Sequence, residues 1–78
     1  MPDPLKVFAK WDQEAQVWVA ESEDVPGLIT EAPTVEALLA KLNVLIPELL
    51  EENDGELTPE IPISVMWETT QTVRIPRR

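Results

Sequence analysis

The sequence predicts a small α+β domain in which a mostly antiparallel sheet of order β-β-β-α-β carries one helix on one face. Three observations lead to this prediction. Short β-prone segments precede one long segment with helical apolar spacing, and another β-prone segment follows it. A Pro-Gly turn and a polar loop separate the early segments. The chain has 78 residues, which predicts a single domain over residues 1–78.

Alternation and turn residues predict the first three strands. Residues 5–11 alternate apolar and polar side chains, which is typical of a half-buried strand. The polar residues 12–15 form a loop of hairpin length. Residues 16–22 are rich in β-formers and apolar on both faces, as in a central strand. Residues 28–31 form a short third strand.

Turn and cap residues mark the boundaries on either side of this third strand. Pro26 sets the backbone angle for the second position of a type II turn, and Gly27 supplies the positive φ of the third. Thr34 is a good helix N-cap, and Glu36 lies in the first turn, where the helix dipole favours an anion. We therefore expect the helix to begin directly after Thr34.

Apolar residues at helical spacing predict one helix after this cap. Pro47 lies inside the pattern, so we expect a kink or a restart there, because proline cannot donate to the Asn43 carbonyl. The helix is expected to end within residues 52–56, near Gly55. The apolar stripe consists of Val35, Leu38, Leu42, Leu45, Ile46 and Leu49, and a second row of Leu39, Val44 and Leu50 widens it.

Residues 61–68 form the predicted fourth strand, and the β-prone residues 69–75 either extend it or form a fifth strand. The helix crossover is expected to return the fourth strand beside the first. With the helix on one face, the other sheet face is left uncovered and is a candidate interface between copies of the chain. Its expected members are Phe8, Trp18, Ala20 and Met66.

Composition excludes many chemistries. The chain has no His, Cys or Tyr and only two glycines. A Ser-His-Asp or Cys-His triad, His- or Cys-ligated zinc and a Gly-rich phosphate loop are therefore excluded. Composition leaves a Ser-Lys arrangement open, but no spacing in the sequence supports one. The acidic residues around Gly55 do not match a calcium loop, because Leu50 and Ile61 would occupy ligand positions. We expect no catalytic residue, no metal and no cofactor.

The charge of the chain bears on its partners. The net charge is −9, with 15 acidic and 6 basic residues. This balance disfavours a nucleic-acid partner and favours a basic protein, although acidity also serves solubility alone. Basic residues gather only at Arg74, Arg77 and Arg78. The candidate partner-binding residues are Glu23, Asp24 and Glu31.

Targeting signals and cysteines bear on the compartment. The chain has no cysteine, and its first residues lack the basic and apolar regions of a signal peptide. Its longest apolar stretch is interrupted by polar residues and is too short to span a bilayer. We therefore expect a cytoplasmic protein with no membrane contact.

The stretch ESEDVPGLITEAPTVEALL resembles the N-terminal domain of HicB-type antitoxins. The matching pattern contains Asp24, Pro26, Gly27 and Thr34, and the likeness covers roughly residues 5–53. The segment LIPELLEEN is similar to a small domain-of-unknown-function branch of that superfamily. The resemblance implies a partial RNase H-like fold and neutralisation of a small basic RNase toxin. The family's C-terminal DNA-binding domain has no counterpart in the eleven residues after Trp67.

Three functions follow from these observations. The first is a non-catalytic binding protein of HicB-like antitoxin type. The second is a self-associating scaffold domain without a toxin, with a homodimer expected first. The third is a metal-dependent nuclease, which is disfavoured because only the acidic clusters and a fold analogy suggest it.

Overall fold

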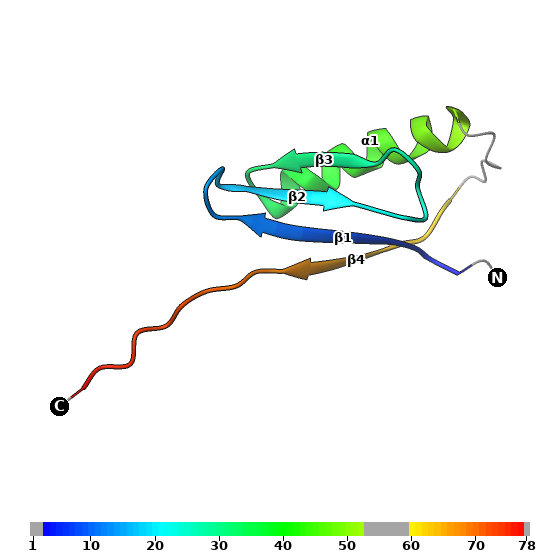
Figure 1. Ribbon diagram of the computed structural model, residues 1–78. Helices are drawn as coiled ribbons and strands as arrows, with labels where there is room; N and C mark the ends of the chain where they lie inside the picture. Colours follow the sequence, from blue (N-terminus) through cyan, green and yellow to red (C-terminus); the bar gives the residue numbers. More distant parts are fainter. Residues whose placement is uncertain (1–2, 53–59, 78) are drawn as a thin grey trace.

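The structure, a computed structural model that describes residues 3–52 and 60–77, has the predicted order of elements (Figure 1). The strands β1 (Leu5–Asp12), β2 (Val17–Glu21) and β3 (Ile29–Ala32) precede the helix α1 (Val35–Glu52), and β4 (Ile63–Glu68) follows it. One helix packed on one sheet confirms the α+β class.

The four strands form one mixed sheet of order β3-β2-β1-β4. The pairs β1–β2 and β2–β3 are antiparallel, as expected of a meander. The pair β1–β4 is parallel, because α1 returns the chain to the end of the sheet at which β1 begins (Figure 1). The prediction that the fourth strand lies beside the first is confirmed.

Ladder register determines which side chains share a face, because directly opposite residues point to the same side of a sheet. Val7 and Ala9 are buried on the side of the sheet that carries the helix, and Val65 and Trp67 stand opposite them on β4. On the helix, Leu38, Leu42 and Ile46 are buried and recur every fourth residue. The buried core comprises Val7, Ala9, Ala20, Val25, Leu28, Ala32, Leu38, Leu42 and Ile46.

The prediction that Trp18 and Ala20 lie on the uncovered sheet face is wrong. The register places Trp18 opposite Trp11 and Ala20 opposite Ala9, which puts both on the helix side. Ala20 is completely buried, and the Trp18 ring meets those of Trp11 and Trp67 edge-on at centroid distances of 5.4 and 5.2 Å. Because β2 is apolar on both faces, its alternation alone does not identify the core side, and pairing with β1 decides it.

The remaining boundaries differ from the predictions in small ways. The helix does not restart at Pro47, since α1 continues through it to Glu52. Pro47 is exposed and lies in the last two turns, where its missing N–H costs one hydrogen bond. No residue from 69 to 77 forms a strand, so neither a fifth strand nor an extended β4 is present in this described segment. The predicted stop at Gly55 lies outside the described residues.

Candidate protein-binding site

In the loop between β2 and β3, side chains form the hydrogen bonds with the β1 backbone that a neighbouring strand would otherwise form. The Lys6 backbone N–H donates to the Asp24 carboxylate at 2.8 Å, and the Ser22 hydroxyl donates to the Lys6 carbonyl. The same hydroxyl accepts from the backbone N–H groups of Asp24 and Val25 at 3.1 and 3.2 Å. Ser22 and Asp24 thus provide hydrogen-bond partners for the Lys6 backbone, which lies beyond the end of its pairing with β2. Asp24 therefore has a structural role.

The Pro-Gly turn and the helix cap follow the predictions. The Leu28 N–H donates to the Val25 carbonyl at 3.1 Å, and Gly27 has a φ of 88°. This closes a four-residue turn with positive φ at its third position. At the helix start, the Thr34 hydroxyl accepts the Ala37 N–H at 3.0 Å. Asp24, Pro26, Gly27 and Thr34 therefore position the chain between the sheet and the helix.

Replacing Asp24 by alanine is expected to lower the free energy of unfolding by about 1 kcal/mol, because the Lys6 N–H loses its acceptor. Asp24→Asn keeps an acceptor oxygen at the same place, so its free energy of unfolding should fall clearly less than that of Asp24→Ala. Urea denaturation of both variants measures the difference. Equal stability of wild type and Asp24→Ala would contradict the structural role.

The sheet face turned away from α1, here called the open face, carries side chains from all four strands. Strand pairing arranges them in rows across the sheet. One row runs Ile29, Glu21, Phe8, Met66, and the next runs Glu31, Val19, Lys10, Glu68. The open face consists of Lys6, Phe8, Lys10, Asp12, Val17, Val19, Glu21, Ile29, Glu31, Ser64, Met66 and Glu68.

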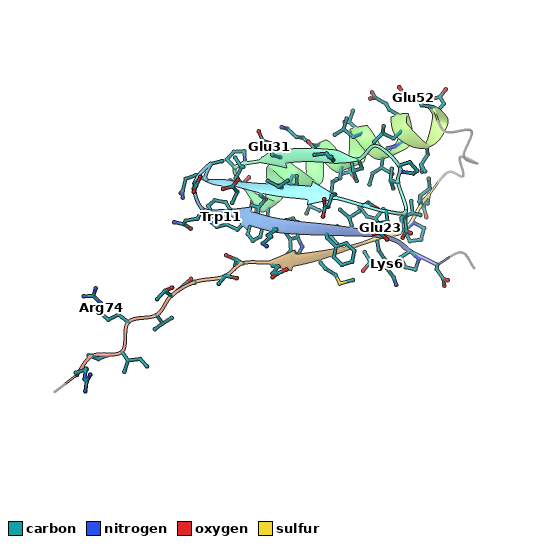
Figure 2. The ribbon with its side chains drawn as sticks, in the orientation of Figure 1. Lys6, Trp11, Glu23, Glu31, Glu52 and Arg74 are labelled. Carbon is teal, nitrogen blue, oxygen red and sulfur yellow. The ribbon has the colours of Figure 1, made fainter. Side chains whose placement is uncertain are left out.

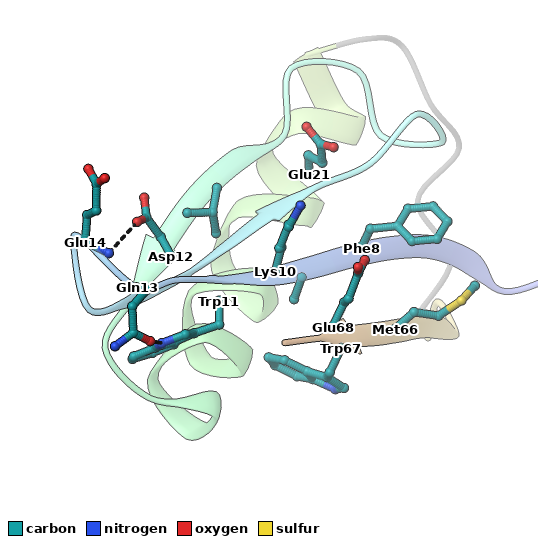
Figure 3. A pocket seen from close by; sticks show the side chains of 12 residues that line it. Phe8, Lys10, Trp11, Asp12, Gln13, Glu14, Glu21, Met66, Trp67 and Glu68 are labelled. Carbon is teal, nitrogen blue, oxygen red and sulfur yellow. Dashed lines mark hydrogen bonds between the residues drawn. The ribbon is translucent and has the colours of Figure 1, made fainter. Parts of the chain in front are cut away.

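Large apolar side chains of the first row are accessible to solvent. Phe8 is 47% exposed, Met66 45% and Ile29 76%. A shallow hollow of about 900 Å³ extends over this region from β4 to the β1–β2 hairpin (Figure 3). Its lining includes Phe8, Met66 and the charged side chains of Lys10, Glu21 and Glu68. Phe8 and Met66 thus lie on the uncovered face, as predicted.

The acidic residues proposed for partner binding do not form one cluster. Glu31 lies on the open face opposite Val19. Glu23 and Asp24 lie in the loop after β2, near Lys6 at the other end of the sheet (Figure 2). The face instead gathers carboxylates that the sequence reasoning did not select, Glu21 and Glu68. Strand alternation alone could assign each of these glutamates to one face of its own strand. Only the ladder register places the two in adjacent rows of the same face.

The hairpin at one end of the open face is ordered by its own side chains. The Asp12 carboxylate accepts the backbone N–H groups of Glu14 and Ala15 at 3.0 and 3.1 Å, and the Trp11 ring N–H donates to Gln13 at 3.0 Å. Gln16 adopts a φ of 58°, which lets the chain reverse within a short loop. This end of the hollow therefore has a defined shape (Figure 3).

Acidic side chains and the helix also bear on metal and membrane binding. In the described ranges, 3–52 and 60–77, no group of three or more carboxylates is placed to hold a metal ion. Within the same ranges, no helix has the length and apolar character that crossing a bilayer requires.

Comparisons with known proteins give a family and one structural relative. The family model described as "Domain of unknown function (DUF1902)" matches residues 4–76. A hypothetical protein, TTHA1013, from the extremely thermophilic bacterium Thermus thermophilus has a known crystal structure, and its sequence is 57% identical to this chain. The match covers 94% of this chain and 100% of that one, with a TM-score of 0.70. No curated protein matches the chain.

Proposed function

The chain belongs to the DUF1902 family of domains of unknown function, and on that premise we propose that it is a non-catalytic binding protein of HicB-like antitoxin type. Its partner in this proposal is a small basic RNase, bound on the open face in the cytoplasm. The observation that carries the proposal is the exposed apolar row of Ile29, Phe8 and Met66 beside a row that contains Glu31 and Glu68.

The apolar row supports a protein partner, because exposed apolar side chains gathered on one face are typical of interaction sites. Phe8 and Met66 stand directly opposite each other on neighbouring strands. Aromatic and methionine side chains are enriched at interface centres and adapt to the surface they meet. The surrounding charged residues would form the polar rim of such a contact.

The charges of the face support a basic partner. Four carboxylates, Asp12, Glu21, Glu31 and Glu68, share the open face with two lysines. The whole chain carries −9, so a basic protein would be attracted over a distance and then guided to this face. The motif likeness of residues 21–39 to HicB-type domains supports an RNase as that protein.

Charge reversal on the open face tests this proposal. In this proposal a small basic RNase is encoded beside the chain, and Glu31→Lys and Glu68→Lys together should weaken its binding by about tenfold or more. Glu48→Lys plus Glu51→Lys, on the helix, makes the same change in net charge and should have a much smaller effect. The measurements are calorimetric binding and stoichiometric inhibition of the partner's RNase activity.

Two outcomes would count against the antitoxin proposal. The first is the absence of a small basic protein that the purified chain inhibits. The second is equal weakening by the sheet and helix charge pairs, because binding would then depend on net charge rather than on the open face. Lower affinity at higher salt is expected in either case, so salt dependence alone does not decide.

Self-association is the second candidate function, and a different observation favours it. Val73 and Ile75, after β4, are 72% and 81% exposed and lie outside every helix and strand of the described chain. A second copy would give these side chains a surface to cover. In this proposal the domain is a homodimeric scaffold and needs no toxin.

A further inference from the structure

We propose that two copies of the chain pair antiparallel along their β4 edges, so that the segment after β4 in each copy runs along β4 of the other. The inference rests on the second candidate function, self-association, and names its surface. It requires no basic partner. β4 lies at one end of the sheet order β3-β2-β1-β4, so one side of its backbone faces no other strand of the described chain.

The parallel ladder shows which backbone groups of β4 face this free edge. The Leu5 N–H donates to the Pro62 carbonyl at 3.0 Å, and Leu5 stands opposite Ile63. Alternate residues of a strand direct their N–H and C=O groups to opposite sides. The backbone N–H and C=O groups of the even-numbered residues of β4 therefore point toward β1. The odd-numbered residues, Ile63, Val65 and Trp67, direct their backbone groups to the free edge.

The segment that would pair with this edge is residues 69–77, here called the C-terminal segment. It continues from β4 away from the body of the molecule (Figure 1). All of its residues are exposed, and none takes part in the hydrogen bonds that the described residues form outside the helix and ladders. From Thr69 to Ile75 it contains β-formers and neither glycine nor proline. Its sequence suits a strand that lacks a neighbour.

A two-fold axis at Thr69 gives a register that matches the two segments. Each residue from 63 to 75 then stands opposite the one equally far from Thr69 in the second copy. Ile75 meets Ile63 and Val73 meets Val65, all on the helix side of the sheet. That side of β4 is incompletely covered, because α1 lies over β3 and β2 and Trp67 remains 36% exposed. The pairing buries apolar side chains against apolar side chains.

The two prolines that bound this run fit the same register. Pro62 and Pro76 are equally distant from Thr69 and would stand opposite each other. Both are even-numbered, so neither removes a donor from the free edge. The odd-numbered residues from Ile63 to Ile75 all retain an N–H. The resulting ladder would be complete across the two-fold axis.

Charge also favours this edge over the rest of the surface. All 15 acidic residues precede Thr69, and three of the six basic residues follow it. In the proposed register, Arg77 of the second copy reaches the end of the sheet at which α1 ends (Figure 1). The last turn of α1 contains Glu51 and Glu52 and no basic residue. Arginine at this end of the sheet would reduce the electrostatic repulsion between two acidic copies.

Two proline substitutions test the pairing in a matched way. Val73→Pro removes an N–H that would bond to the second copy, and Thr72→Pro removes one that would point away from it. Both sites are exposed and outside the monomer's elements, so folding should be unchanged. Sedimentation equilibrium should show a dimer dissociation constant about tenfold or more higher for Val73→Pro, because each change occurs twice in a symmetric dimer. Thr72→Pro should change it much less.

The outcomes of this comparison separate the alternatives. A wild-type monomer at about 100 μM overturns the proposal, since no stable dimer would then form. Equal weakening by the two prolines also overturns it, because edge pairing distinguishes the two N–H groups. Neither result bears on the antitoxin proposal, which depends on charges of the open face.

Cysteine cross-linking gives a second test, and the chain has no cysteine to interfere. Thr69→Cys would face its own copy across the axis at a Cα separation of about 5.5 Å, within the range that a disulfide spans. We expect rapid dimer cross-linking on mild oxidation. Ile29→Cys, on the opposite edge strand β3, is the matched exposed control and should cross-link slowly. Faster cross-linking through Ile29→Cys would overturn the proposal.

Discussion

Replacing Leu42 by alanine is expected to lower the free energy of unfolding by about 2–5 kcal/mol. Leu42 is fully buried in the middle of α1, between Leu38 and Ile46, and it belongs to the core beneath the helix. Truncation removes apolar contacts and leaves a cavity that the sheet cannot fill. A domain of this length has a total stability of about 4–12 kcal/mol, so the loss is a large part of it.

Val44→Ala is the matched control for the core substitution. Val44 lies on the same helix but is 59% exposed. Its truncation should change stability by no more than about 0.5 kcal/mol, because little packing is lost and alanine favours the helix. Guanidinium denaturation of both variants gives the midpoints and slopes. A Leu42→Ala loss below about 1 kcal/mol would contradict the packing of α1 on the sheet.

Replacing Gly27 by valine is expected to destabilise the fold by about 1–3 kcal/mol, the usual cost of backbone strain. Gly27 has a φ of 88°, which a β-branched residue rarely adopts. An added Cβ has room, since it would lie 3.5 Å from Leu49 Cδ2, an ordinary contact. The cost therefore comes from the conformation of the turn.

The control for the turn is Gly27→Asn, because asparagine tolerates positive φ better than valine. We expect its melting temperature to lie between those of wild type and Gly27→Val. Thermal unfolding followed by circular dichroism measures all three. An unchanged melting temperature for Gly27→Val would show that this turn does not require positive φ in solution.

Local signals in the sequence predicted the elements because each signal acts over a few residues. Pro26 and Gly27 set turn geometry, and Thr34 satisfies a donor three residues ahead. Apolar spacing identified the buried stripe that contains Leu38, Leu42 and Ile46. The roles of Ser22 and Asp24 at Lys6 were not predicted, because those contacts span 16 and 18 residues.

The sequence by itself determined the strand order along the chain, the turn, the helix start and the exclusion of histidine and cysteine chemistry. Only the tertiary structure decided which face of β2 is buried and which residues meet on the open face. Trp18 is the clearest example, since its neighbours in sequence are apolar on both sides and its pairing with Trp11 places it under the helix. The physical reason is that alternation along a strand shows which side chains share a face but not which of the two faces is buried. The hydrogen-bonded register with strands distant in sequence decides which face is buried.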